Sequence, residues 1–451
     1  MSCANPRPET TFSDRCKAAR IAAFVFSLCL AFAASQPAHA QNFQLIYAFS
    51  GATDGGYPLS GLAMDAAGNL YGTSSSAFNQ QTCPTGCLVI YELSPTSSGW
   101  NFTTLFTGQN ATEGSTPIGS MAFGPDGNLY GTTAYGGNAN GCDPGFGCGI
   151  VFQLTPTNDG WSESVLYQFS GAPDGDFPQG ALAFDSVGNL YGTTADGGST
   201  VGCRGGGCTG NGVVYEISLS GTPAESVLYS FGATRVDDGI GPAGGVVFDP
   251  AGNLYGTTAQ GGQLGYGTVF ELTPIPSGWR ENVLYDFDGG RDGVWLAAGV
   301  VLDAAGNLYG GTKYNYRAGG GGAAFELSPS GDTWIHDVLY DFHSGACGTF
   351  PCHLGGGPVS NFILDQAGNL YGTTTVDGQY DCGSVFKLSR QGNLWTHTSL
   401  HDFTCGIDGS NPSGSLVMDS SGNLYGTTTN GGVDDLNCPS GCGVIFKITQ
   451  Q

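Results

Sequence analysis

Residues 249–262 read DPAGNLYGTTAQGG, and close copies of this stretch occur seven times in the 451-residue chain. The glycine that opens each G-N-L-Y-G lies at positions 68, 127, 188, 252, 306, 368 and 422. Self-similarity at a period of about 60 residues indicates one large repeat architecture rather than several unrelated domains.

Four apolar segments recur around every copy, as the fourth copy illustrates. They are GGVVFD (244–249), NLYGTT (253–258), GTVFELTP (267–274) and WRENVLYDF (279–287). Each is short, rich in β-branched and aromatic residues, and bounded by Gly, Asp, Asn or Pro, which is typical of β-strands joined by turns. The D-x-x-G-N between the first two segments predicts a tight hairpin with Gly252 in a left-handed conformation.

Seven units of four strands predict an all-β fold, a seven-bladed β-propeller of four-stranded blades. FQLIYAF (43–49) is a copy of the fourth strand, and GVIFKIT (443–449) is a copy of the third strand with no fourth strand after it. We therefore expect the N-terminal strand to complete the last blade in a 3+1 arrangement, which removes free sheet edges. Residues 41–451 would form this single domain.

The N-terminus has the pattern of a signal peptide. Basic residues at 15, 17 and 20 precede an apolar run over 21–34, and Ala38-His39-Ala40 forms an A-x-A cleavage site. The apolar run is too short to span a bilayer comfortably. We expect residues 1–40 to be removed and the remainder to be secreted, without a membrane span.

The composition narrows the class of partner. The chain has 78 glycines, 12% aromatic residues, 11% charged residues and a net charge of −24. This many aromatics favours a packed core over disorder. Such an acidic surface repels nucleic acid and anionic membranes and attracts cations. Acidity that only keeps a secreted protein in solution is the alternative.

Twelve of the fifteen cysteines follow the predicted leader, and an even number in a secreted chain indicates disulfides. The expected pairs are Cys83–Cys87, Cys142–Cys148, Cys203–Cys208, Cys347–Cys352, Cys382–Cys405 and Cys438–Cys442. His343 and His353 flank the fourth pair, which gives that segment the composition of a Zn²⁺ site. Export and the parallel pairs elsewhere favour the disulfide.

The pattern GNLYGTT…GG…GTVFELTP…W…VLY.F resembles the tandem repeat of the GloVer (Gloeobacter–Verrucomicrobia type) family over essentially all of residues 43–450. The D-x-x-G-N-L-Y turn is more weakly similar to NHL-type propeller repeats. The resemblance implies a bacterial, exported repeat propeller, and it implies no established activity.

Acidic residues recur in the loops that follow the fourth strand, usually as acid-Gly-x-x-Pro. These loop acids are Asp54, Glu113, Asp174, Asp238, Asp292 and Asp408. In a propeller these loops share one face with the loops between the second and third strands, which carry cysteine pairs. Six acids in a ring could bind Ca²⁺. The alternative is that each carboxylate caps backbone N–H groups of its own turn.

The fifth unit departs most from the pattern. It has Trp295 in the loop before its first strand, and NLYGGTKYNYRAGGGG (307–322) replaces the usual second strand and cysteine pair. The basic and aromatic residues gathered here are Arg291, Trp295, Lys313, Tyr314, Tyr316 and Arg317. Such a patch could stack on a sugar ring and pair with its carboxylate. Sequence drift in a tolerant loop is the alternative.

Tryptophans at 100, 161, 279, 334 and 395 open the fourth strand in five units, and this regular placement predicts packing between blades. The sequence has no G-x-S-x-G, no phosphate-binding loop and no isolated Ser/His/Asp set. We therefore expect a monomeric binding or scaffold protein that engages an extracellular polymer, such as an acidic glycan, or a protein partner. The alternative is a hydrolase or lyase acting on extracellular polysaccharide, with Ca²⁺ as its one candidate cofactor.

Overall fold

The computed structural model describes residues 42–450 except 77–82, 84–85, 138–141, 143–145, 201–209, 233–236, 316–319, 344–355, 393 and 434–437. The predicted signal peptide lies outside the described residues, as do Tyr316, Arg317 and the Cys203–Cys208 and Cys347–Cys352 pairs. Within the described part, no helix is long and apolar enough to cross a membrane.

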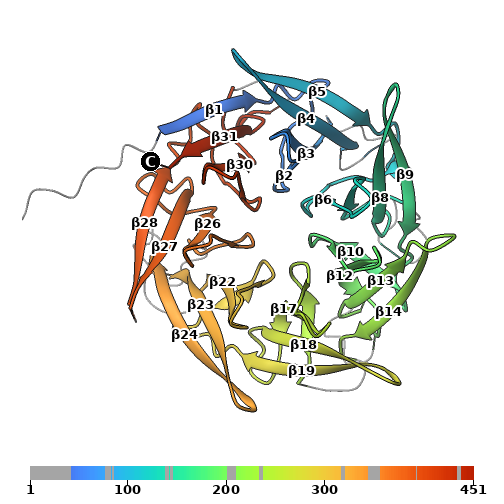
Figure 1. Cartoon of the computed structure of the whole chain (residues 1–451), viewed down its shortest axis with the longest axis vertical. Helices are drawn as coiled ribbons and strands as arrows, with labels where there is room; N and C mark the ends of the chain where they lie inside the picture. Colours follow the sequence, from blue (N-terminus) through green and yellow to red (C-terminus); the bar gives the residue numbers. More distant parts are fainter. Residues whose placement is uncertain are drawn as a thin grey trace, which may run out of the picture. The chain divides into compact units, whose positions relative to one another are not determined.

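Seven antiparallel sheets stand in a ring, which confirms the seven-bladed β-propeller (Figure 1). Blades 1 and 2 comprise β2 (Ala63–Met64), β3 (Leu70–Ser75), β4 (Leu88–Thr96) and β5 (Gly99–Thr107), then β6 (Ala122–Phe123), β7 (Leu129–Thr133), β8 (Ile150–Thr157) and β9 (Gly160–Gln168). Blades 3 and 4 comprise β10 (Gly175–Pro178), β11 (Ala183–Phe184), β12 (Leu190–Gly197), β13 (Val213–Ser218) and β14 (Ala224–Ser230), then β15 (Gly239–Pro242), β16 (Val247–Phe248), β17 (Leu254–Gly261), β18 (Thr268–Ile275) and β19 (Gly278–Asp286).

The remaining blades follow the same order. Blades 5 and 6 comprise β20 (Val294–Leu296), β21 (Val301–Leu302), β22 (Leu308–Tyr314), β23 (Gly320–Ser330) and β24 (Thr333–His343), then β25 (Ile363–Leu364), β26 (Leu370–Thr374), β27 (Ser384–Gln391) and β28 (Leu394–Asp402). Blade 7 comprises β29 (Val417–Met418), β30 (Leu424–Thr428), β31 (Val444–Thr449) and β1 (Asn42–Ala48), and a 3-10 turn at Ala111–Glu113 links blades 1 and 2.

The N-terminal strand closes the ring as expected. β1 pairs antiparallel with β31, from Asn42 opposite Thr449 to Ala48 opposite Val444. The outermost strand of blade 7 therefore comes from the opposite end of the chain, and the sheet hydrogen bonds between the two ends close the ring.

In the repeat at residues 249–262, Gly252 and Gly256 are required for different reasons. Gly252 has φ +87, and a Cβ there would meet nothing within 4 Å, so the turn needs its left-handed backbone and not its small size. A Cβ at Gly256 would lie 2.5 Å from Cζ of Phe270, so this glycine makes room for a buried ring. Asp249 Oδ1 completes the turn by accepting hydrogen bonds from the N–H groups of Ala251 and Asn253.

The innermost strand differs from the four-strand expectation. It has only two residues in each blade, and in blades 3, 4 and 5 an additional strand pairs with the far end of the second strand. The segment between the two pieces runs beside its neighbours at the ring centre. A Cβ at Gly244 would lie 2.0 Å from the backbone nitrogen of Gly299 in the next blade. Backbones in contact leave no room for a continuous strand with side chains.

Adjacent blades share their hydrophobic cores. One buried cluster joins Tyr255, Val269 and Phe287 of blade 4 to Leu308 and Phe325 of blade 5. Hydroxyl groups reinforce the seams near the centre, where Thr193 and Thr257 Oγ1 each donate to a backbone carbonyl of the next blade at 2.6 Å. The blades are therefore held as one cooperative unit and not as separate sheets.

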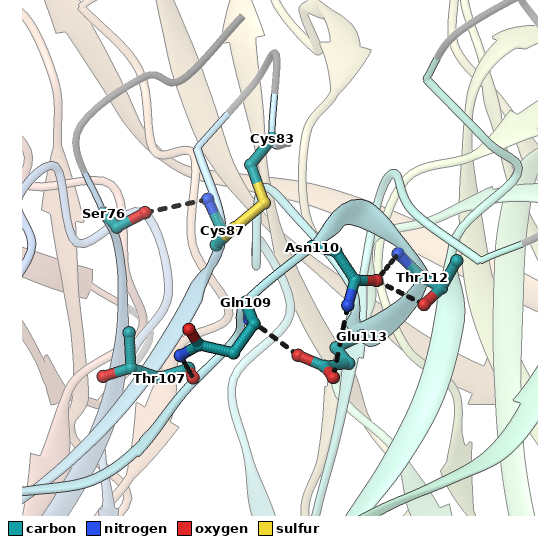
Figure 2. Close-up of a disulfide and its surroundings, with 8 residues drawn as sticks. All are labelled: Ser76, Cys83, Cys87, Thr107, Gln109, Asn110, Thr112 and Glu113. Atoms are coloured by element: carbon teal, nitrogen blue, oxygen red, sulfur yellow. Dashed lines mark hydrogen bonds between the residues drawn. A yellow bond between two sulfur atoms is a disulfide. The ribbon is translucent and has the colours of Figure 1, made fainter. Parts of the chain in front are cut away.

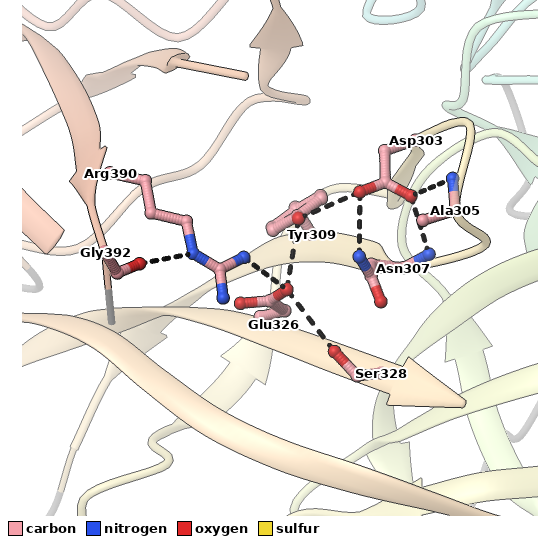
Figure 3. Close-up of polar contacts among 8 residues, drawn as sticks. All are labelled: Asp303, Ala305, Asn307, Tyr309, Glu326, Ser328, Arg390 and Gly392. Carbon is pink, nitrogen blue, oxygen red and sulfur yellow. Dashed lines mark hydrogen bonds and ion pairs between the residues drawn. The ribbon is translucent and has the colours of Figure 1, made fainter. Parts of the chain in front are cut away.

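Polar contacts also cross the seams on the face of the D-x-x-G-N turns (Figure 3). The Tyr309 hydroxyl lies 3.1 Å from both Asp303 Oδ2 of its own turn and Glu326 Oε1 of the adjacent strand. Arg390 of blade 6 reaches the same Glu326 oxygen at 3.4 Å. On this face, the polar side chains therefore stabilise the turns and the contacts between blades.

Candidate functional site

The opposite face carries two sets of loops, one joining each fourth strand to the next blade and one joining second and third strands. We call it the loop face. Backbone bonds link the two sets: the N–H groups of Tyr57 and Phe177 donate to the carbonyls of Cys442 and Cys148, at 2.8 and 3.1 Å. The cysteine loop of one blade therefore holds the acidic loop that leads into the next.

Four of the predicted disulfides lie within the described residues and are formed: Cys83–Cys87, Cys142–Cys148, Cys382–Cys405 and Cys438–Cys442. Each constrains a loop of the loop face. These four disulfides, together with the absence of a membrane-spanning helix in the described part, fit an extracellular protein.

One position in the acidic loops, three residues after the acid, has left-handed backbone. The non-glycine residues there are Tyr57, Thr116, Phe177, Trp295 and Asn411, with φ between 52 and 62°. Aromatic residues rarely adopt this conformation, and a following proline, present after all except Trp295, disfavours helical backbone further. Strain of this kind persists only where surrounding structure enforces it, and it concentrates at binding sites and switches.

A cavity of about 250 Å³ occupies the ring centre. Its wall is built from small residues contributed by every blade, among them Gly61, Gly180 and Ala298. Of the described residues that line it, Lys313 is the sole ionisable one. In a chain with net charge −24, the described part of the cavity wall thus has one lysine and no acidic residue.

Blade 5 brings three of the predicted site residues together. Pairing of β20 with β22 sets Val294 opposite Tyr314, and the Trp295 ring meets the Tyr314 ring edge-on at 6.4 Å. Lys313 Nζ lies 5.3 Å from the centre of the Tyr314 ring. Trp295 is 47% exposed. We call Trp295, Lys313 and Tyr314 the Trp295 site.

Arg291 is exposed in the loop between β19 and β20. No hydrogen bond, ion pair or ring contact joins it to the Trp295 site among the described residues. Tyr316 and Arg317 lie outside the described residues.

The loop acids act within their own loops. The Oδ2 atoms of Asp54, Asp174 and Asp238 accept hydrogen bonds from the hydroxyls of Tyr47, Tyr167 and Tyr229, at 2.9, 3.0 and 2.8 Å. Each of these carboxylates also accepts backbone N–H groups of the same loop. The Tyr-to-Asp bond fastens each loop to the fourth strand before it.

The other three loop acids follow this arrangement with local changes. Glu113 accepts from the N–H of Gln109 at 2.7 Å, beside the Cys83–Cys87 disulfide (Figure 2). Asp408 lies 3.1 Å from Nε2 of His401. Asp292 accepts from Tyr285 at 3.2 Å, and burial, together with Asp288, raises its pKa to about 6.

The structure does not gather the loop acids around one point. In the described part of the chain, the group of side chains close enough to share a metal ion is Cys142, Cys148 and Asp176. Its two cysteines form a disulfide, which leaves them unfit as thiolate ligands. Ca²⁺ binding by the loop acids and capping of their own turns are the two alternatives from the sequence, and melting in EDTA and in added Ca²⁺ decides between them.

Apart from Lys313, sequence reasoning missed the residues of the cavity wall. Most of them lie just after the acidic loops, in the segments PLSGLA (58–63), PIGSMA (117–122), PQGALA (178–183), PAGGVV (242–247), LAAGVV (296–301), PVSNFI (358–363) and PSGSLV (412–417). The signal was a small residue, usually Gly, Ala or Ser, before an apolar one in every repeat. Small residues at a turn are also typical of simple connections between strands, so this pattern did not indicate a cavity.

The repeat profile that describes the Gloeobacter/Verrucomicrobia repeat matches residues 34–202, 145–355 and 348–451. The chain belongs to the Gloeobacter/Verrucomicrobia repeat family. No curated protein sequence matches this member of the family significantly.

Solved structures share the fold of this repeat-family protein at low identity. The extracellular domain of a candidate one-component system from B. thetaiotaomicron is 12% identical with a TM-score of 0.52, over 90% of this chain and 40% of that one. An ulvan lyase solved with -[GlcA(1-4)Rha3S]- is 12% identical with a TM-score of 0.49, over 90% and 96%. A candidate 6-phosphogluconolactonase from Bacteroides uniformis is 16% identical with a TM-score of 0.45, over 75% and 83%. These likenesses show the fold alone.

Proposed function

We propose that this protein is an extracellular glycan-binding module that holds a carboxylate-bearing polysaccharide on its loop face. The observation that carries the proposal is Trp295, a large aromatic residue that is 47% exposed although its backbone is left-handed. An exposed indole held in a strained conformation is costly to retain without a partner.

The neighbours of Trp295 suit a sugar. Contact with Tyr314 at 6.4 Å limits how far the indole can turn, so little side-chain freedom is lost when a ligand stacks on it. Flat aromatic surfaces pack against the apolar face of a pyranose ring. A rigid exposed aromatic therefore supplies contact area at low entropic cost.

Lys313 favours an acidic sugar over a neutral one. Lys313 belongs both to the cavity wall and to the Trp295 site, and the described residues of the wall include no carboxylate. A uronic acid stacked near Trp295 could accept a charge-assisted hydrogen bond from Nζ. The net charge of −24 opposes an anionic chain at long range, but salt screens exposed charges beyond about 8 Å at physiological ionic strength. The short-range pairing can therefore dominate.

Turnover of the polysaccharide is the alternative function. Asp292 precedes Trp295 by three residues, and its pKa of about 6 would suit proton transfer near neutral pH. Its side chain is buried, however, and it accepts from Tyr285 and from the N–H of Asp288. Because the Asp292 carboxyl group bonds within its own loop and does not line the cavity, binding is favoured over catalysis as the function.

A glycan array probed with purified residues 41–451 tests the proposal. We expect retention on uronic acid glycans, loss with Trp295→Ala, and at least a tenfold weakening with Lys313→Ala. Leu394→Ala, at a 75% exposed position in blade 6, is the matched control. Equal binding by wild type, Trp295→Ala and Lys313→Ala would disprove the site, and new reducing ends in the bound glycan would establish turnover instead.

A further inference from the structure

A second aromatic cluster lies on the loop face, between blades 2 and 3. The Phe177 ring meets the Tyr135 ring edge-on at 5.1 Å, and the Tyr135 ring lies 5.6 Å from that of Phe146. Phe146 is 38% exposed, and the other two rings are half-buried. We call Tyr135, Phe146 and Phe177 the Phe177 patch.

The Phe177 patch is built like the Trp295 site. Phe177 and Trp295 each lie three residues after a loop acid and have left-handed backbone, with φ of 62 and 60°. The residue after each pairs with the threonine at the equivalent place in the second strand, Pro178 with Thr194 and Leu296 with Thr312. Equal backbone conformation and equal register direct both aromatic side chains toward the loop face.

Each cluster lies close in sequence to a residue that lines the central cavity. Gln179, two residues after Phe177, lines the cavity, and so does Ala297, two residues after Trp295. Around the ring, blade 4 lies between blade 3, whose β10 carries Phe177, and blade 5, whose β20 carries Trp295 (Figure 1). The described residues of the cavity wall include no acidic one, so an anionic chain that crosses the cavity meets no carboxylate in that wall.

A disulfide and backbone hydrogen bonds constrain the Phe177 patch. The Cys142–Cys148 disulfide closes the loop that carries Phe146, and the Phe146 carbonyl accepts from the N–H of Gly136 at 2.7 Å. The carbonyl of Cys148 accepts from the N–H of Phe177. Side chains fixed in this way lose little freedom on binding.

We infer that the Phe177 patch is a second binding site for the same polysaccharide, so that one extended chain contacts the Phe177 patch, crosses the cavity and stacks on Trp295. This inference rests on the proposed function. Two linked contacts raise affinity far more than either contact alone, because the second one is intramolecular. The Trp295 site would hold any acidic oligosaccharide, and the Phe177 patch would select long chains.

Calorimetric titration with oligogalacturonides of increasing length, from the disaccharide to the dodecasaccharide, tests the inference. We expect the affinity to increase at least tenfold once the chain spans both clusters. Phe146→Ala should remove this increase and leave disaccharide binding unchanged, while Phe146→Tyr should preserve it. Leu264→Ala is the matched control, since Leu264 is 54% exposed in the corresponding loop of blade 4.

The outcomes separate the two proposals. If no oligogalacturonide binds, or if Trp295→Ala binds the disaccharide as well as wild type does, the proposed function fails. If the disaccharide binds at Trp295 but affinity does not depend on length, the Phe177 patch is not a second site. An equal loss with Phe146→Ala and Leu264→Ala would also overturn it.

Discussion

The indole of Trp100, in the first blade, packs edge-on against Tyr425, in the last blade, with ring centroids 5.9 Å apart. The same pair joins neighbours elsewhere, since Trp161 meets Tyr71 and Trp395 meets Tyr309 at 5.8 and 6.1 Å. At these seams the tyrosine of G-N-L-Y-G thus packs against the tryptophan of the following blade. At Trp100 and Tyr425 this contact joins residues from opposite ends of the chain.

Truncating Trp100 should weaken ring closure. We expect Trp100→Ala to lower the free energy of unfolding by about 2 kcal/mol, less than for a fully buried tryptophan because this one is partly exposed. Urea denaturation measures the loss, and Leu394→Ala should change stability by less than about 0.5 kcal/mol. A Trp100→Ala protein as stable as wild type would show that the β1–β31 pairing closes the ring alone.

Two buried tyrosines are predicted to stabilise the fold less than phenylalanine would at the same positions. Tyr91 and Tyr215 occupy the place that Phe270 has in blade 4, above the glycine of L-Y-G, and their buried hydroxyls have no partner among the described residues. An unpaired buried hydroxyl costs about 1 kcal/mol or more. Tyr91→Phe and Tyr215→Phe should therefore each raise the unfolding free energy by about 1 kcal/mol.

Tyr309→Phe is the contrasting substitution, because that hydroxyl lies 3.1 Å from two carboxylate oxygens. It should lower stability by about 1 kcal/mol. Stabilities that move in the same direction for Tyr91→Phe and Tyr309→Phe would contradict the assignment of buried hydroxyls as unpaired.

The two central glycines of the repeat should respond differently to alanine. Gly256→Ala places a methyl group 2.5 Å from Phe270 and should cost about 3 kcal/mol through overpacking. Gly252→Ala meets no atom and should cost about 1 kcal/mol, for left-handed backbone alone. Thermal melting of the pair checks the order, and the double variant Gly256→Ala with Phe270→Leu should recover part of the loss.

Two half-buried glutamates should make stability depend on pH. Burial first, and then the charges of Glu113 and Asp174 respectively, raise the pKa of Glu163 and of Glu225 to about 7. A carboxyl whose folded pKa lies above its unfolded value stabilises the fold fully at low pH. That contribution is lost as the pH rises from about 4.5 through 7.

Glutamine variants at these positions should reveal the effect. Glu163→Gln and Glu225→Gln should match wild type near pH 4.5 and exceed its stability by about 1 kcal/mol each near pH 8, a figure reduced because both groups are partly exposed. Chemical denaturation at both pH values is the measurement. A wild-type advantage at high pH would reverse the sign and disprove the assignment.

Removing divalent ions should leave the fold unchanged. Asp54, Asp174 and Asp238 already accept hydrogen bonds from tyrosine hydroxyls and backbone N–H groups, so an ion would have to displace these donors. We expect the same melting temperature in EDTA and in added Ca²⁺. A clear rise in Ca²⁺ would establish instead the cation site that the acidic loops suggest from sequence.

The sequence predicted the fold because the residue pattern within each repeat indicates its strands, its turns and its contacts with the next blade. The tryptophan position of Trp161 and the tyrosine position of Tyr71 recur from repeat to repeat, so packing between blades could be predicted from the sequence alone. The function of the loop acids does not follow from the sequence, since an Asp-Gly turn suits both a cation and a backbone cap. Only the tertiary structure shows the capping contacts, such as the bonds from Tyr47 and Tyr167 to Asp54 and Asp174.

What the sequence determined by itself was periodic: seven copies of one hairpin-rich unit can bury their apolar faces only against one another, and the ends must meet to close the ring. Only the tertiary structure decided which residues from distant repeats meet at the centre of the ring. Gly61, Gly180 and Ala298 lie far apart in the chain, and nothing in their spacing shows that all three line one cavity. The closed ring brings them together, because every blade contributes the same loop position to the same central opening.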